Sequence, residues 1–582
     1  MTRSLKAALL AASLVLAAAP ALAQEGGRGV PAPAQLSASE RDNYRAIFAA
    51  LRAQDWAGAA GRLDGMRDGP LHNLARAMLY TMPGSPRVET APLTELLARA
   101  PELPQAEALA RLARTRGAES LPDLPDTQRL YGLAGQPRRA RPRPIRGDEV
   151  ADRLEPLIQP LIRDDQPVEA EALLNTRVAE LSDEARTAFQ QRIAWVYYLN
   201  GYDAECRRIA DLARRGPTEY ALNSEWVSGL ASWRMGDYAA AGEHFQTVAA
   251  RSTDIELTAA GHYWAARADT AGGHPERVQA RLRSAARLNE TFYGLLAQSA
   301  LGMRTPPADM TTFTEADWRA LSGLRNARAA IALSEIGEND LAAELIRRQA
   351  QIGRPGEHEH LIHLAARLNL TATQMYLSHN GPRGSHFGPS ERYPTPSWRP
   401  TRGWRVDPSL AFAHALQESQ FRADAVSPVG ARGLMQVRPG TAGDMARARG
   451  EAFSPGSLNT PAVNIEYGQS YLEQLRDLAS TGGLLPKVIA SYNAGPAPIA
   501  EWNTRYDQSD PLLYIESIPY WETRGYVPII LRNYWIYEAR GADQSPSRLA
   551  LTQGLWPRFP GLPGPSAVRI APRPRQTAMG QD

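Results

Sequence analysis

Residues 407–419 read DPSLAFAHALQES, and the interpretation of the C-terminal part of the chain starts from this stretch. Aspartate is a favoured helix N-cap residue and proline is favoured at the first helical position, so Asp407 and Pro408 predict the start of a helix. Glu418 would lie about three turns along this short, largely apolar helix. Apolar surroundings disfavour an ionised carboxylate, so we expect a raised pKa for Glu418 and a role as general acid. The alternative is an ordinary surface glutamate near a helix end.

Three more motifs follow in order. Residues 427–436 form a glycine-rich loop, SPVGARGLMQ, and residues 490–496, ASYNAGP, end an amphipathic helix at a glycine suited to terminate it. Residues 516–527 read ESIPYWETRGYV, within a stretch from 501 to 540 that holds nine aromatic residues. Flat rings with polar edges suit the faces and hydroxyls of sugars. A plain aromatic core is the rival explanation.

With these motifs, residues from about 394 to 540 resemble the catalytic domain of the soluble lytic murein transglycosylases, which has a lysozyme-like fold. Four motifs match in the family's order and approximate spacing: Gln417-Glu418-Ser419, Gly433-Leu434-Met435-Gln436, Tyr492-Asn493-Ala494-Gly495 and Glu522-Thr523-Arg524-Gly525-Tyr526-Val527. Asn464, Gly468 and Tyr471 fit the intervening helix of that family.

The resemblance implies that Glu418 is the only catalytic acid and base. Glu418 would protonate the glycosidic oxygen between N-acetylmuramic acid and N-acetylglucosamine, and would then accept the proton of the muramic acid C6 hydroxyl. The product is a 1,6-anhydro sugar and no water is consumed, whereas ordinary glycosidases use two carboxylates. No metal or cofactor is implied.

The resemblance also implies a set of substrate-binding residues around Glu418. The set is Ser427, Met435, Gln436, Tyr492, Asn493 and Glu522. Met435 would form an apolar wall, Tyr492 would lie near the reacting centre, and Glu522 would position hydrogen bonds. As alternatives, Gln436 and Asn493 could cap local backbone, and Glu522 could pair with Arg524 or Arg532.

The sequence departs from the family pattern in three places. His414 and Leu416 stand where an aliphatic residue and an arginine are common, and Arg438 stands where methionine is frequent. His414 shares a helical face with Glu418, four residues later, so a charged His414 would lower the pKa of Glu418. We expect instead a buried, neutral histidine. Arg438 could favour an acidic stem peptide.

Two other functions stay open. A hydrolytic muramidase would need a second acid such as Asp424, Glu451 or Glu466 with room for a water molecule. A non-catalytic cell-wall-binding scaffold would use the helical N-terminal part to recruit partners.

The N-terminal part has helical periodicity from about residue 37 to 375. A turn with Gly, followed by a large and a small residue, recurs at Gly201 and Gly236, 35 positions apart, with weaker echoes near Asp55 and Gly337. This spacing predicts helical hairpins of the tetratricopeptide type stacked in an α-solenoid. The expected fold class is therefore mainly α: an N-terminal superhelix, similar to that of the same family, followed by a lysozyme-like catalytic domain.

The chain start and two proline-rich stretches suggest the domain limits. Arg3 and Lys6 precede an apolar run and a small-residue cleavage pattern, so residues 1–23 are typical of a secretory signal peptide cut after Ala23, which predicts a periplasmic location. The expected divisions are a superhelix at 24–377 with a Pro/Arg-rich loop at about 117–148, a linker at 378–402, a catalytic domain at 403–540 and a Pro-rich tail at 541–582.

Composition excludes several classes of protein. The 582 residues include 65 Lys and Arg against 62 Asp and Glu, a net charge of +3, which argues against a nucleic-acid binder that relies on a basic field. Cys206 is the only cysteine, which rules out an intrachain disulfide and a thiolate metal cluster. No stretch is long and apolar enough to predict a membrane span. The expected partner is the peptidoglycan glycan strand, with cell-wall synthesis or secretion machinery as a further hypothesis.

Overall fold

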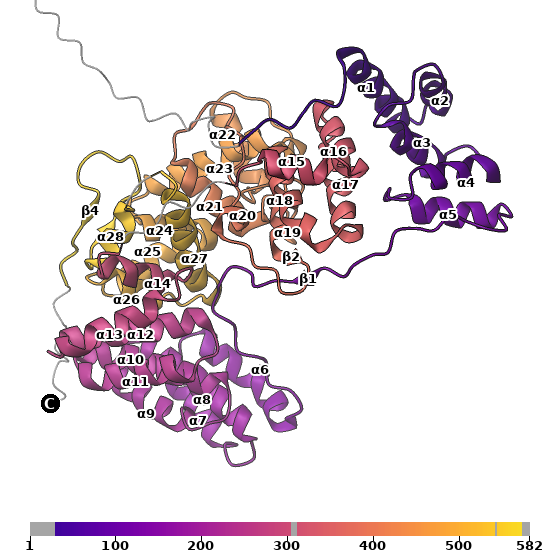
Figure 1. Ribbon diagram of the computed structural model, residues 1–582. Coiled ribbons are helices and arrows are strands. Elements are labelled where there is room, and N and C mark those ends of the chain that lie inside the picture. Colours follow the sequence, from indigo (N-terminus) through magenta and orange to yellow (C-terminus); the bar gives the residue numbers. More distant parts are fainter. Residues whose placement is uncertain (1–28, 304–310, 542–543, 573–582) are drawn as a thin grey trace, which may run out of the picture. The chain divides into compact units, whose positions relative to one another are not determined.

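The computed structural model describes residues 29–303, 311–541 and 544–572, and their packing forms two units that alternate along the chain (Figure 1). The first unit contains residues 29–126 and 311–368. The second contains residues 127–303, 369–541 and 544–572. The predicted signal peptide lies outside the described residues, so cleavage after Ala23 stays a prediction.

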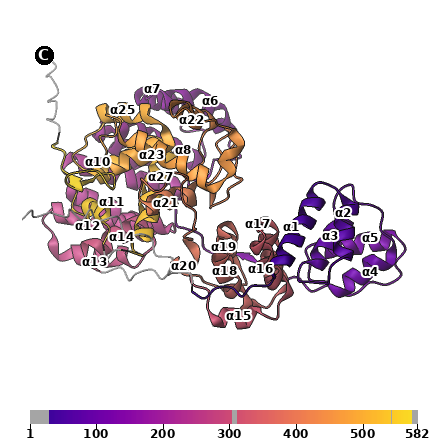
Figure 2. The same cartoon turned by 90° about the horizontal axis from the view of Figure 1, so that it is seen from above.

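The first unit consists of short helices joined by tight turns, and Figure 2 shows the first five grouped together. They are α1 (Ala38–Arg52), α2 (Trp56–Asp64), α3 (His72–Thr81), α4 (Thr90–Arg99), α5 (Ala106–Thr115), α15 (Glu315–Leu321), α16 (Arg325–Glu335), α17 (Asn339–Ile352), the 3-10 helix η2 (Pro355–Glu357) and α18 (His358–Arg367). Helix starts follow capping chemistry: the Asp55 side chain accepts from the Gly58 N–H at 2.9 Å to begin α2. Gly337, with φ of 85°, turns the chain between α16 and α17.

The second unit begins with stacked helical hairpins. They comprise α6 (Glu149–Arg163), α7 (Pro167–Asn175), α8 (Asp183–Leu199), α9 (Asp203–Ala213), α10 (Glu219–Met235), α11 (Tyr238–Arg251), α12 (Ile255–Ala271), α13 (Pro275–Ala286) and α14 (Phe292–Ala300). Gly201 and Gly236, the two predicted turn residues, both have positive φ, at 82° and 80°, and connect α8 to α9 and α10 to α11. Gly273, with φ of 81°, adds a turn between α12 and α13 that the sequence reading missed. The predicted helical hairpins are therefore confirmed here.

The rest of the second unit surrounds the helix predicted from residues 407–419. Its elements are α19 (Thr371–His379), α20 (Pro389–Arg392), α21 (Pro408–Ser419), α22 (Pro439–Ala448), η3 (Pro455–Asn459), α23 (Pro461–Arg476), α24 (Leu485–Ala494), α25 (Pro496–Arg505), α26 (Pro511–Glu516), α27 (Trp521–Glu538) and α28 (Pro546–Thr552). Helix α21 packs against α27, which also contacts α24. This arrangement brings three of the four sequence motifs together on neighbouring helices.

The Pro/Arg-rich segment from 118 to 147 contains no helix, and it is anchored rather than fully solvated. Its strand β1 (Tyr131–Gly132) pairs antiparallel with β2 (Asn380–Gly381). Arg139 donates two hydrogen bonds of 2.7 Å to the buried Glu516 carboxylate, which also accepts from the Tyr293 hydroxyl at 2.6 Å. The predicted Pro/Arg-rich loop is therefore packed against the rest of the second unit at Arg139.

The C-terminal segment is also more structured than a tail. Residues 544–572 contain α28 and the antiparallel pair β3 (Trp556–Pro557) and β4 (Ala567–Val568). Trp556 and Leu551 are fully buried, and the Trp556 indole N–H donates to the Gln508 carbonyl at 2.6 Å. Prolines in this segment obscured helical periodicity in the sequence, although three of its apolar residues, Leu551, Trp556 and Phe559, join the hydrophobic core.

Candidate active site

The candidate site is built around the last turn of α21. The helix starts as predicted, because the Asp407 carboxylate accepts from the Ser409 N–H at 2.8 Å. The helix ends abruptly: Gln420 and Phe421 both have left-handed backbone angles, with φ of 52° and 61°. Glu418 thus lies beside the C-terminal carbonyl groups of the helix, whose partial negative charge disfavours an ionised carboxylate.

The Glu418 carboxylate lies close to two residues of α27. The buried Tyr526 hydroxyl donates a hydrogen bond to Glu418 Oε1 at 2.6 Å. The pKa of Glu418 is raised to about 7, mainly by burial; the Tyr526 hydrogen bond opposes the rise and the nearby Glu522 charge adds to it. A carboxyl group that is substantially protonated near neutral pH has the property required of a general acid. Glu418 therefore has the raised pKa that we expected from the sequence.

His414 is neutral and lies on the buried face of α21. Its side chain is fully buried, and Nδ1–H donates to the Leu410 carbonyl at 2.9 Å. Burial lowers the pKa of His414 to about 4, so it carries no charge that could lower the pKa of Glu418. Its ring packs 4.7 Å from that of Tyr492 and 6.1 Å from that of Tyr526. The expectation of a buried neutral histidine is confirmed.

The glycine-rich loop after α21 is held by an asparagine from α23. Asn464 Oδ1 accepts from the Met435 N–H, and Asn464 Nδ2 donates to the Arg432 and Leu458 carbonyls, all at 2.8 Å. Gly433 has φ of 72°, and a Cβ there would lie 2.2 Å from Asn464 Nδ2. Only glycine fits this position, which explains the Gly-Leu-Met-Gln motif in physical terms.

Two side chains join this loop to the neighbouring helices. The Ser419 hydroxyl donates to the Leu434 carbonyl at 2.8 Å, and the Tyr492 hydroxyl donates to the Met435 carbonyl at 2.7 Å. Burial, followed by the charge of Glu418, raises the pKa of Tyr492 well above its usual value, so Tyr492 stays a neutral donor. Met435 is fully buried, so the expectation that it forms an apolar wall facing the substrate is wrong.

Ser427 and Gln436 make hydrogen bonds within the loop. The Ser427 hydroxyl accepts from the Ala431 N–H at 3.0 Å, and Gln436 Nε2 donates to the Gly433 and Ala425 carbonyls at 2.9 and 3.2 Å. For Gln436 this is the local-backbone alternative considered above. Both side chains are only partly buried, so each retains solvent-accessible surface.

Asn493 and Glu522 form a polar cluster between α24 and α27. Asn493 Nδ2 donates to Glu522 Oε1 at 3.1 Å, and the Thr523 hydroxyl donates to Asn493 Oδ1 at 2.6 Å. Within the described ranges Glu522 pairs with neither Arg524 nor Arg532. Arg524 donates to the Ile518 carbonyl, and Arg532 pairs with Glu256 of α12. The alternatives for Asn493 and Glu522 are therefore wrong.

The carboxylates considered for a hydrolytic mechanism have other partners. Glu466 is buried against Arg405 and Arg449, at 3.0 and 3.2 Å. Burial would raise the pKa of Glu466, but the bonds and charge of Arg405 outweigh it and the net pKa is lowered. Glu451 pairs with Arg402, and Asp424 is exposed. An ion-paired carboxylate is a poor general base, so Glu466 and Glu451 do not favour a second catalytic role.

Most aromatic residues between 501 and 540 belong to the core rather than to a sugar-binding surface. Seven are buried: Trp502, Tyr506, Tyr514, Tyr526, Tyr534, Trp535 and Tyr537. Tyr520 differs, because 51% of it is exposed, and its ring packs edge-on against Trp502 at 5.2 Å. The aromatic-core explanation holds for the majority of this set.

Tyr526 lies within the motif at 522–527, but its contact with Glu418 was not predicted from the sequence. The available signal was its spacing, because Tyr526 follows Glu522 by four residues and so shares a helical face with it. The direct hydrogen bond to Glu418 bridges 108 positions and could not be derived from that spacing.

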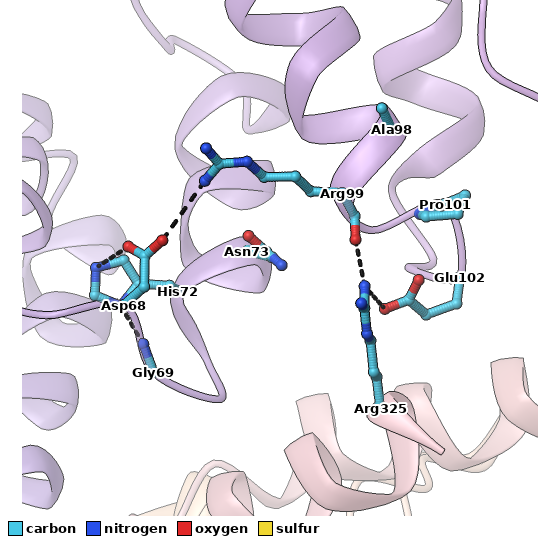
Figure 3. Close-up of a pocket in the computed structure, with 9 residues that line it drawn as sticks. All are labelled: Asp68, Gly69, His72, Asn73, Ala98, Arg99, Pro101, Glu102 and Arg325. Atoms are coloured by element: carbon cyan, nitrogen blue, oxygen red, sulfur yellow. Dashed lines mark hydrogen bonds and ion pairs between the residues drawn. The ribbon is translucent and has the colours of Figure 1, made fainter. Parts of the chain in front are cut away.

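A separate hollow of about 510 Å³ lies in the first unit (Figure 3). Its charged lining residues pair with one another: Arg99 with Asp68 at 3.5 Å and Arg325 with Glu102 at 3.8 Å. His72 Nδ1 accepts from the Tyr44 hydroxyl at 2.9 Å, which ties this imidazole into the helix packing.

Comparison with known proteins identifies the class of domain that carries Glu418. Residues 398–515 match the model of the transglycosylase SLT domain family. The soluble lytic murein transglycosylase of Salmonella typhimurium is 39% identical over 136 residues, which are 23% of this chain and 21% of the relative. The soluble lytic murein transglycosylase of Escherichia coli is 37% identical over 158 residues, which are 27% of this chain and 24% of the relative. The match thus spans about a quarter or less of these relatives.

The similarity in fold to solved structures covers most of the chain. The 70 kDa soluble lytic transglycosylase of Escherichia coli aligns with a TM-score of 0.56 and 18% identity, covering 90% of this chain and all of the other. An inactive mutant of the lytic transglycosylase Slt from Pseudomonas aeruginosa aligns with a TM-score of 0.53 and 21% identity, and the alignment covers 88% of this chain and 74% of the other. The predicted fold class, a mainly α chain with a superhelical part and a lysozyme-like domain, is confirmed. Among the described residues, no helix has the length and apolar character needed to cross a bilayer.

Proposed function

We propose that this protein is a peptidoglycan lytic transglycosylase. It would cleave the β-1,4 bond between N-acetylmuramic acid and N-acetylglucosamine and leave a 1,6-anhydro-N-acetylmuramic acid end. The observation that carries the proposal is a partly buried carboxyl, Glu418, with a pKa of about 7, in a domain of the SLT family. The matched relatives are named soluble lytic murein transglycosylases, which supports murein as the substrate.

The proposed reaction uses Glu418 twice. In the first step the protonated carboxyl gives its proton to the glycosidic oxygen as the bond to the muramic acid C1 breaks. In the second step the C6 hydroxyl oxygen of the same sugar bonds to C1 and its proton passes to the Glu418 carboxylate. The proton count balances, the enzyme returns to its starting state and no water enters.

The surrounding residues would hold the acid and the sugar in place. Tyr526 fixes one oxygen of Glu418 through its 2.6 Å hydrogen bond. We assign substrate contacts to Ser427, Gln436 and Tyr492, and the positioning of α24 against α27 to the Asn493–Glu522 pair. A catalytic group held by packed neighbours needs little reorganisation when the barrier is crossed.

A variant comparison tests this function directly. Glu418→Gln keeps the size of the side chain and the acceptor for Tyr526 but cannot deliver a proton. We expect the purified variant to bind sacculi, keep its helical circular dichroism spectrum and release no muropeptides. Glu501→Gln, which alters an exposed glutamate on α25, should retain wild-type turnover. Undiminished sacculus digestion by Glu418→Gln would refute the assignment, and binding without turnover by the wild-type chain would favour the scaffold function.

We further propose export to the periplasm, based on the leader-like sequence at 1–23 and on the substrate class. N-terminal sequencing of the protein recovered from a periplasmic fraction should begin at Gln24. Recovery only in the cytoplasmic fraction with the leader intact would contradict the export proposal.

A further inference from the structure

Helix α18 of the first unit carries an unusual concentration of histidine. Three of the ten histidines of the chain fall within residues 358–363, HEHLIH. His360 and His363, three positions apart, lie on one face of α18 and approach Asp317 of α15. This cluster is separate from Glu418 and its chemistry plays no part in the proposed reaction.

The three side chains direct one ligand atom each toward a common point. His360 Nδ1 lies 2.6 Å and His363 Nδ1 lies 2.9 Å from the same oxygen, Asp317 Oδ1. The three atoms all lie within 4.8 Å of one another. Asp317 is buried, whereas the His360 and His363 side chains retain 31% and 17% exposure, which leaves a path for an ion to enter.

The other oxygen of Asp317 is already fixed. Asp317 Oδ2 accepts from the Thr314 N–H and from the Thr314 hydroxyl, both at 2.6 Å, in the capping box that starts α15. This bonding turns Oδ1 toward the two imidazoles. Metal-binding carboxylates are commonly held by such outer hydrogen bonds.

The second nitrogen of His363 also has an acceptor nearby. Glu359 Oε1 lies 3.9 Å from His363 Nε2. If Nδ1 binds a metal, the imidazole proton resides on Nε2, where Glu359 can accept it after a small side-chain movement. A carboxylate behind a ligating histidine is a recurrent arrangement in zinc sites.

Two imidazole nitrogens and one carboxylate oxygen are ligands that Zn²⁺ prefers, with the remaining position open to water. Hydrogen bonds from the two imidazoles would also account for both contacts to Asp317 Oδ1, and the metal titration described below distinguishes the two explanations. We propose that Asp317, His360 and His363 form a Zn²⁺ site that links α15 to α18.

Zinc titration of the metal-stripped, untagged full chain tests this site. Calorimetry should detect one Zn²⁺ equivalent per chain, and His360→Gln and His363→Gln should each weaken binding by at least about tenfold. His274→Gln serves as the matched control and should bind zinc like the wild type, because His274 lies in the second unit next to Glu276 and its side chain is 45% exposed. The absence of stoichiometric zinc binding by the wild type, or binding as tight as the wild type by His360→Gln and His363→Gln, would overturn the proposal.

A second measurement does not depend on the folding of variants. Co²⁺ added to the wild-type chain should develop the visible absorption bands of a four- or five-coordinate ion, and Zn²⁺ should displace them. Zinc should also raise the thermal midpoint of the wild type, because a ligand that binds only the folded state stabilises it. Absence of both effects would contradict a zinc site at Asp317.

Discussion

At the scale of single residues, the electrostatics of Glu418 depend on two neighbours with opposite effects. Burial raises the pKa of Glu418 to about 7, the Tyr526 hydrogen bond opposes this rise, and the Glu522 charge adds to it. Both neighbours lie on α27, so one helix sets the protonation state of a group on another. The balance between them can be measured by changing each one separately.

We expect Glu522→Gln and Tyr526→Phe to shift the activity profile in opposite directions. A general acid must be protonated, so kcat/KM should fall as the pH rises through about 7 in the wild type. Loss of the Glu522 charge lowers the pKa of Glu418 and moves this decline to lower pH. Loss of the Tyr526 hydroxyl moves it to higher pH, and the lost hydrogen bond should reduce the maximum rate about tenfold. Profiles of kcat/KM against pH check both shifts; shifts in the same direction would contradict the assignment.

Glu418 should also destabilise the folded protein at high pH. The pKa of Glu418 is raised from 4.5 to about 7, so the folded protein holds the Glu418 proton more tightly than the unfolded chain does. The free energy of unfolding is therefore highest at low pH, and this stabilisation is lost as the pH rises through 7. Glu418→Gln should therefore increase the free energy of unfolding at pH 8 by up to roughly 3 kcal/mol, with no gain at pH 4. Denaturation curves at both pH values check this, and an equal effect at both would mean that the pKa is not raised.

At the scale of elements, the site depends on how the loop at 425–437 is held between helices. The sequence predicts the start of α21 because Asp407 and Pro408 act locally, and it predicts a glycine-rich loop. It does not predict that Asn464 bonds the Met435 N–H, because this contact spans 29 positions and an asparagine within a helix gives no pairing signal. The motifs were visible from the sequence, but their contacts depend on tertiary packing.

Asn464→Ala should destabilise the second unit strongly. Three hydrogen bonds of the buried Asn464 side chain would be lost, and the backbone groups of Met435, Arg432 and Leu458 would lose these partners. We expect a cost of about 3 kcal/mol or more, since each unpaired buried group costs roughly 1–3 kcal/mol. Chemical denaturation measures the loss, with exposed Asn175→Ala at the end of α7 as the control. Equal stability of the two variants would show that Asn464 does not hold the loop.

At the scale of the whole molecule, segments distant in sequence support the second unit. Arg139 and Glu516 are 377 positions apart, and their pairing anchors the segment that the sequence predicts only as a Pro/Arg-rich loop. Local patterning predicted the hairpins at Gly201 and Gly236, because each turn depends on a few neighbouring residues. It could not predict buried ion pairs, which depend on where distant elements meet.

Arg139→Ala should release the segment at 118–147. The Glu516 side chain is 1% exposed, so removal of Arg139 leaves a buried charge without its cation, at a cost of about 3–5 kcal/mol. Limited trypsin digestion should then cut after the neighbouring arginines, such as Arg138 and Arg141, faster than in the wild type. Arg143→Ala, at a position with an 88% exposed side chain, is the control.

A double variant separates the ion pair from general damage. Arg139→Met with Glu516→Gln removes both charges, so it should be more stable than Arg139→Ala alone. If the loss of stability in the double variant equals the sum of the losses in Arg139→Met and Glu516→Gln, Arg139 acts through packing rather than through Glu516.

The mechanism with Glu418 as both acid and base is tested most directly by mass spectrometry of sacculi digested in H₂¹⁸O. The account predicts 1,6-anhydro muropeptides without ¹⁸O from the wild-type chain and no product from Glu418→Gln. Reducing-end muropeptides that carry ¹⁸O, or anhydro products that persist in Glu418→Gln, would contradict it.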